Sequence, residues 1–145
     1  MRRAKFDTLP NHFATLRFIT ISSFVMPALN KLGPERATSA MNAISVAAVR
    51  PAYMTVLFGT AALTVATGVS GIRNRDALLI SGSAVFLVGA IGLTVGYHVP
   101  LNDALAQGST TWPHYVRGWT TLNHVRAASG IAAAALIGAS ALRGS

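Results

Sequence analysis

The residues best suited to chemistry lie in two polar stretches of an otherwise apolar chain, residues 98–103 and 112–126. The first stretch contains His98 and the second contains His124. Imidazole is the side chain whose unperturbed pKa lies nearest neutrality, so general acid–base chemistry would fall to one of these histidines. A copper or iron ion held by the same two residues is the alternative, although no close ligand spacing such as HExxH is present.

A helix that begins at Pro113 would gather the aromatic side chains of the second stretch on one face. Proline suits the first turn of a helix because its φ is fixed and the N–H it lacks would have no partner there. We therefore expect Asn123 and Arg126 to form one wall of a site, with His124 on another side of the helix. An interfacial aromatic belt is the alternative role for the aromatic residues. At roughly 100° per residue, six side chains fall within about 100° of one another: Trp112, Tyr115, Val116, Trp119, Asn123 and Arg126.

The composition is that of a membrane protein. Hydrophobic residues make up 52% of the 145 residues and charged residues only 11%, against about 25% charged in soluble domains. The net charge of +8 comes from Lys and Arg scattered at the ends of apolar runs, which favours anionic lipid headgroups over nucleic acid. The absence of cysteine excludes disulfides and thiolate metal sites, and the basic N-terminus lacks the pattern of a removable signal peptide.

Two uncharged runs, residues 52–72 and 77–97, predict transmembrane helices. Each has about 21 residues, which at 1.5 Å per residue match a hydrocarbon core of about 30 Å. The short link between them requires an antiparallel hairpin. The last run, residues 127–142, is too short to span alone, so it must borrow from the stretch before it. The NHVR tetrad should then lie in or just under the membrane interface.

The remaining segments are less regular. Residues 12–32 form a more polar run that we expect to span with a kink at Pro27, a re-entrant or surface segment being the alternative. Residues 34–48 predict either an amphipathic helix at the membrane surface or an extension of the next helix as far as Pro51. We expect Pro100 to end the third spanning helix.

The predicted fold is all-α: residues 1–145 form a single four-helix transmembrane bundle with a polar, aromatic-rich loop between the third and fourth helices. Gly89, Gly92 and Gly96 lie on or near one face of the third helix, where small residues let helices pack closely in lipid. The basic N-terminus and the RNRD link favour cytoplasmic termini, in the plasma membrane of a bacterium. Association into a homo-oligomer is a further expectation.

Four motifs occur in a fixed order: VMPALNKL from residue 25, FGTAAL from residue 58, HVPLNDAL from residue 98, and W-x-x-Y-x-x-x-W-x-x-x-NHVR from residue 112. In order and spacing they resemble the anthrone oxygenase family, also called DUF1772, of small four-helix membrane proteins. The resemblance covers roughly residues 24–142, and the pairing of PLN with NHVR is its most specific part. The chain departs from the family in a more polar first helix and at His98, where the resemblance leads us to expect Asn.

The resemblance implies an oxygenase that converts an anthrone to an anthraquinone with O₂. Such a reaction can run without a cofactor, since an electron-rich enolate reduces O₂ itself once a base has removed a proton. A non-catalytic membrane interaction or binding protein is the rival class. The implied roles are His124 or His98 as base, Asn102, Asn123 and Arg126 as donors to the oxyanion or peroxide, and Trp112, Tyr115 and Trp119 as the aromatic wall for a hydrophobic substrate.

Overall fold

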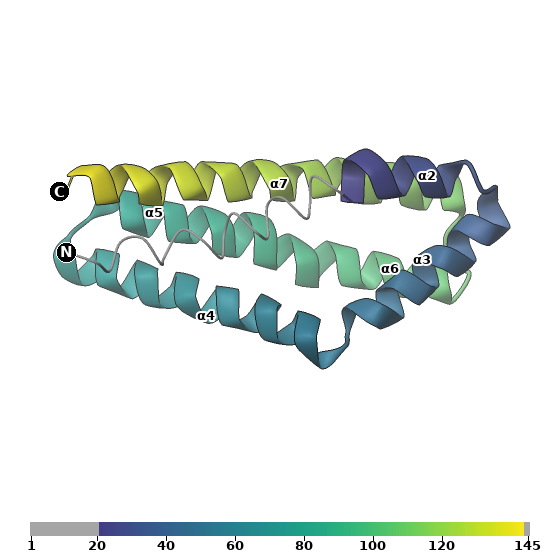
Figure 1. The fold of residues 1–145 in the computed structure, drawn as a ribbon, viewed down its shortest axis with the longest axis horizontal. Helices are drawn as coiled ribbons and strands as arrows, with labels where there is room; N and C mark the ends of the chain where they lie inside the picture. Colours follow the sequence, from purple (N-terminus) through teal and green to yellow (C-terminus); the bar gives the residue numbers. More distant parts are fainter. Residues whose placement is uncertain (1–20, 144–145) are drawn as a thin grey trace.

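The computed structural model describes residues 21–143, and in this range every regular element is helical (Figure 1). Within residues 21–143, three helices are long and apolar enough to cross a membrane: Met54–Asn74, Ala77–Ala106 and Trp112–Arg143. The chain is thus an all-helical integral membrane protein, as predicted. Most of the predicted first span, residues 12–32, lies outside the described residues, and the described part holds five helical segments instead of four spanning helices.

The predicted hairpin joins α4 (Pro51–Asn74) to α5 (Ala77–Phe86). Arg75 turns the chain in the left-handed conformation, with φ 54°. The carboxylate of Asp76 then accepts hydrogen bonds from the backbone N–H groups two and three residues later, at 2.9 and 3.2 Å. This cap gives partners to donors that an uncapped helix start leaves unpaired. The antiparallel pair predicted from the short link is confirmed.

The longest helix, α7 (Trp112–Arg143), packs along α5 (Figure 1). Small residues allow the close approach: a Cβ at Gly82 would lie 2.8 Å from Cγ1 of Ile137, and one at Gly89 would overlap Ser129. The packing role predicted for Gly89 is confirmed. The buried side of α7 follows spacings of three and four residues, as one face of a helix requires, and includes Trp112, Tyr115, Trp119, Asn123, Arg126, Gly130, Ala133, Ile137 and Ser140.

The prediction that Pro100 ends the third spanning helix is wrong. Two π-helical stretches, η2 (Leu87–Gly92) and η3 (Thr94–His98), lead from α5 into α6 (Val99–Ala106), so the chain stays helical through the proline. At the end of η3 a backbone N–H bonds to the C=O five residues back. In an α-helix the proline ring would clash with the carbonyl four residues earlier, and the wider turn avoids this clash.

The prediction of a polar, aromatic-rich loop between the third and fourth helices is also wrong. Only residues 107–111 separate α6 from α7. The aromatic residues instead belong to the first turns of α7, where Pro113 occupies the second helical position. This agrees with the prediction that Pro113 opens a helix, and with the prediction that the last apolar run borrows the stretch before it.

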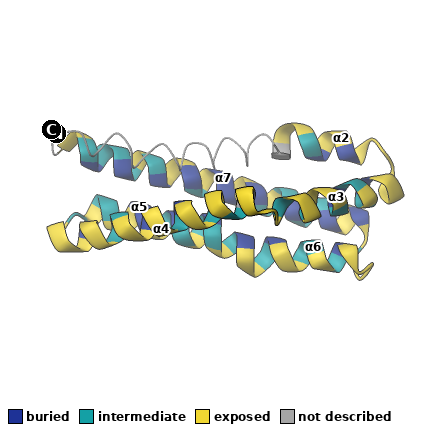
Figure 2. Cartoon of the chain, turned by 60° about the horizontal axis from the view of Figure 1, so that its bottom comes forward, coloured by how far each residue is buried: buried dark blue, intermediate teal, exposed yellow. Residues whose placement is uncertain are grey.

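A separate helix, α3 (Pro34–Ala48), precedes the hairpin, so the alternative in which it extends the next helix is wrong. Arg50 is extended, with ψ 151°, because a residue before proline is sterically kept from the helical region. Buried residues lie where α3 meets α2 (Met26–Asn30), α6 and the start of α7 (Figure 2). We call this the aromatic end of the molecule; its core is Met26, Leu29, Ala37, Met41, Leu105, Trp112, Tyr115 and Trp119.

Candidate functional site

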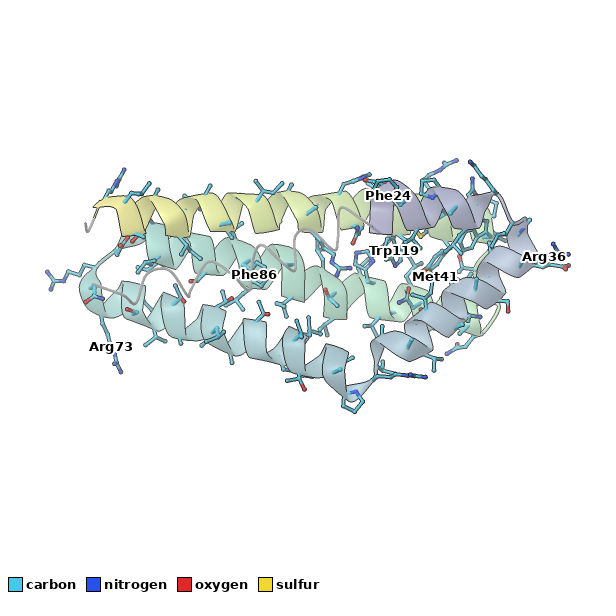
Figure 3. The ribbon with its side chains drawn as sticks, viewed as in Figure 1. Phe24, Arg36, Met41, Arg73, Phe86 and Trp119 are labelled. Atoms are coloured by element: carbon cyan, nitrogen blue, oxygen red, sulfur yellow. The ribbon has the colours of Figure 1, made fainter. Side chains whose placement is uncertain are left out.

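His98 is the last residue of η3 and is 2% exposed. Its ring meets the indole of Trp119 edge to face, with centroids 5.1 Å apart and planes at 71°; Figure 3 shows Trp119 inside the aromatic end, beside Met41. Among the described residues, neither imidazole nitrogen has a hydrogen-bond partner, and the indole N–H has none either. The backbone of Leu122 comes near the ring without the geometry of a hydrogen bond. Because buried polar atoms are normally paired, these two rings form an unsatisfied polar site.

An amide and a guanidinium from α7 lie on the same side of the helix as Trp119. Asn123 is fully buried and Arg126 is 4% exposed. The charge of Arg126 acts on the ring of His98, so the two side chains are close enough to interact electrostatically. A charged group in a spanning helix is costly unless it has a function or a polar setting. The face expected from helical periodicity is therefore the buried face, and His98 from the neighbouring helix meets it.

Asn102 makes a hydrogen bond between two helices. Its side-chain oxygen accepts a hydrogen bond of 2.7 Å from the hydroxyl of Tyr115, which ties α6 to α7. Trp112, which precedes Tyr115 by about one helix turn, stacks on it with ring centroids 5.6 Å apart. Its indole N–H donates a hydrogen bond of 3.0 Å to the side-chain oxygen of Asn30. These two bonds hold three helices together at the aromatic end.

Asn30 is a site-forming residue that the sequence analysis missed. An available signal was its position as a lone amide within the apolar VMPALN motif. Such a residue in an apolar segment needs a hydrogen-bond partner. The sequence alone does not say that this partner is Trp112, which lies 82 residues further along the chain.

His124 does not join His98. It is exposed on α7, one residue beyond the buried Asn123, because successive helical residues point about 100° apart. No three His, Cys, Asp or Glu side chains in residues 21–143 are grouped so that they could hold a metal ion. The pair of histidines proposed as base or metal ligands is thus split between the interior and the surface.

An open, shallow groove of about 250 Å³ lies between α2 and α7, and we call it the cavity. Met26, Pro27 and Asn30 line it from α2, and Val116 and Thr120 line it from α7. Thr120 directly follows Trp119, so the cavity lies beside the helix turn that carries the indole. Its lining offers an apolar surface with an amide and a hydroxyl.

The fold and site define an integral membrane protein that buries an imidazole, an indole, an amide and a guanidinium together at one end of a helical bundle. The family model of anthrone oxygenase matches residues 39–136, well over half of the chain, so the chain belongs to the anthrone oxygenase family. No curated protein and no solved structure matches it. The matched region includes His98, Asn102 and the whole of residues 112–126, while Asn30 and the rest of α2 lie outside it.

Proposed function

We propose that this protein is a membrane-embedded oxygenase that uses O₂ to oxidise a hydrophobic, anthrone-like aromatic ring without a cofactor. The observation that supports it most is the buried imidazole of His98, which lacks a hydrogen-bond partner within the described residues and touches the indole of Trp119. A catalytic base needs an accepting nitrogen that no structural bond occupies. Membership of the anthrone oxygenase family supplies the reaction class.

In this proposal His98 removes a proton from the CH₂ group that lies opposite the ketone of the substrate. The electron-rich enolate then passes electrons to O₂ and forms a carbon–oxygen bond, and the resulting hydroperoxide loses water to give the second ketone. The indole N–H of Trp119 donates to the enolate oxygen, with Asn123 and Arg126 supplying the positive potential that stabilises developing negative charge. Of the two candidate bases, His98 is preferred because His124 is exposed.

Asn102 and Tyr115 act in this scheme by position instead of by contact with the substrate. Their hydrogen bond fixes α6 against α7 and so sets the distance between His98 and Trp119. The ring enters through the cavity between α2 and α7, where Thr120 lies next to the indole. Hydrophobic substrates and O₂ both partition into lipid, so an opening at the side of the bundle suits them.

Helix lengths support a site near one membrane surface. From Ala77 at the hairpin to His98 the chain rises about 30 Å at 1.5 Å per residue, which is the thickness of the hydrocarbon core. From Arg143 back to Arg126 it covers about 26 Å. We therefore place His98 and Arg126 just under the surface opposite the hairpin. The hairpin arginines favour the cytoplasmic side for the other surface.

The test is oxygen uptake by detergent-purified protein supplied with an anthrone. His98→Ala should lower the rate by about 10²- to 10⁴-fold, the contribution of a general base. His124→Ala is the matched control and should leave the rate unchanged. No uptake by the unaltered protein with any anthrone would favour a non-catalytic binding role and overturn the proposal.

Two further measurements separate the alternatives. His98→Asn introduces the residue that the family resemblance leads us to expect; retained activity would show that His98 is not the base, whereas loss supports it. Elemental analysis of the same samples tests metal dependence. About one copper or iron per chain that disappears in both His98→Ala and His124→Ala would identify a metalloenzyme instead.

A further inference from the structure

Side chains spaced by four residues form the buried side of the third spanning helix. Phe86, Ala90, Thr94 and His98 are all buried, and Asn102 continues the series as a half-buried residue. In an α-helix each step of four residues turns about 400°, so the side chains drift by about 40° per step and about 160° over the whole series. An α-helix could therefore not keep Phe86 and Asn102 on one side.

The π-helical stretches correct this drift. Hydrogen bonds to the fifth residue back put more residues in each turn, so a spacing of four stays close to one face. Both η2 (Leu87–Gly92) and η3 (Thr94–His98) lie inside the four-residue series. The site therefore depends on a helix geometry that is less favourable than the α form, and something must select it.

A proline follows two of the three π-helical stretches in the described residues; η2 has none close by. η3 ends two residues before Pro100, and another π-helical stretch, η1 (Ile21–Val25), ends two residues before Pro27. In both places the ring excludes the ordinary bond to the fourth residue back, because proline has no N–H and would clash with that carbonyl. The same arrangement at two unrelated points of the chain argues that proline selects the π turn.

We propose that Pro100 is a positioning residue: it selects the η3 turn, and this turn aims His98 at Trp119. This inference rests on the proposed function at one point only, the catalytic role of His98. With an N–H at position 100, the turn can return to the α form. His98 then rotates away from Trp119, and Tyr97, which is half-buried with its hydroxyl beside Gly118 of α7, rotates further toward that helix. Both side chains rotate in the same sense about the helix axis, and the helix itself is kept.

The absence of native cysteine makes this rotation measurable. Single-cysteine variants His98→Cys and Tyr97→Cys are prepared with and without Pro100→Ala, and their labelling rates with a water-soluble maleimide are compared in detergent. We expect Pro100→Ala to speed labelling at position 98 about fivefold and to slow it at position 97 by a similar factor, the scale of a local change in protection. Pro113→Ala, in the first turn of α7, is the matched control and should change neither rate.

Unchanged labelling at both positions would overturn the proposal, and so would faster labelling at both, which reports local unfolding instead of rotation. Oxygen uptake gives a separate readout. In the chain that keeps His98, Pro100→Ala should lower the rate of oxygen uptake. In the His98→Ala variant, adding Pro100→Ala should not lower that rate further. If labelling shifts as expected while oxygen uptake persists, Pro100 positions His98 but the proposed base role of His98 fails. The two proposals can therefore fail independently.

Discussion

The two ends of this bundle are held together in opposite ways. At the hairpin end, where residues 73–76 lie beside the end of α7, helices meet through small residues such as Gly82, and Ser140 donates a hydrogen bond to Asp76. At the aromatic end, large rings fill the core and side-chain hydrogen bonds join helices far apart in sequence. The hairpin end is held by close packing of helix backbones. The aromatic end is held by a network of side-chain contacts and hydrogen bonds.

This difference indicates where the molecule has room for function. In lipid, small residues give close helix packing and little else, so the hairpin end is a scaffold. Within the described residues the hairpin side of α5 leaves the hydroxyl of Ser83 unpaired, whereas the aromatic end brings unpaired polar atoms of two rings together, those of His98 and Trp119. Since each unpaired buried polar group costs stability, a protein that keeps two such groups together is keeping them for a ligand or a reaction.

The largest loss of stability should come from adding bulk at the hairpin end. Gly82→Val places a Cβ 2.8 Å from Cγ1 of Ile137 and 3.2 Å from the backbone oxygen of Ala133. Separating α5 from α7 should cost about 1–3 kcal/mol, as overpacking does, and should lower the thermal midpoint in detergent. Gly59→Val is the control, because a Cβ there meets nothing within 4 Å. Equal midpoints for the two variants would contradict the close-packed scaffold.

At the aromatic end the damaging change is removal of a polar atom instead of addition of bulk. Tyr115→Phe deletes the hydroxyl that donates to Asn102 at 2.7 Å, without altering the ring. The expected cost is about 1 kcal/mol, because a buried acceptor is left without its partner. Thermal unfolding checks it, and Asn102→Ala combined with Tyr115→Phe should cost little more than Asn102→Ala alone. Additive losses would mean that the bond contributes nothing.

A smaller, pH-dependent effect belongs to the hairpin end. The hydrogen bond from Ser140, together with the backbone bonds of the helix cap and the nearby charge of Arg143, holds the pKa of Asp76 below its ordinary value of 3.8. When the pKa of a carboxyl is lower in the folded than in the unfolded chain, the carboxylate stabilises the fold. This stabilisation is complete at pH values above the unfolded pKa, and it is lost as the pH falls from the unfolded pKa through the folded pKa. The thermal midpoints of the unaltered protein and Asp76→Asn should therefore differ at pH 7 and converge toward pH 3. A gap between the two midpoints that persists at pH 3 would contradict the role of the carboxylate.

Features set by local chemistry could be predicted from the sequence. The hairpin follows from two uncharged runs and a four-residue link, and the buried face of α7 follows from spacings of three and four that start at Pro113. Both depend on residues close together in the chain. The split between the buried Asn123 and the exposed His124 has the same origin, since it is a property of one helix.

What could not be predicted depends on geometry outside the ordinary α-helix or on distant partners. Pro100 was expected to end a helix because proline does not fit the interior of an ordinary α-helix, whereas the chain passes it through a π turn. No other helix of the described residues comes within 4 Å of a Cβ built at Gly92 or Gly96, so the packing role predicted for these two glycines stays a prediction. Nor could periodicity pair Asn30 with Trp112, because their contact arises only when α2 folds back onto α7.

The smallest effect on stability, and the sharpest contrast between the two ends, is expected for His98→Leu. The substitution removes two buried nitrogens that lack partners in the described part of the chain and keeps an apolar side chain of similar size against Trp119. Replacing an unpaired polar group by an apolar one is close to neutral or stabilising, so the thermal midpoint should stay level or rise. Oxygen uptake with an anthrone should nevertheless fall by about 10²-fold or more if the imidazole is the base. A structural histidine would show the reverse pattern, a lower midpoint with unchanged turnover, and that result would place His98 with Tyr115 among the residues that hold the aromatic end together.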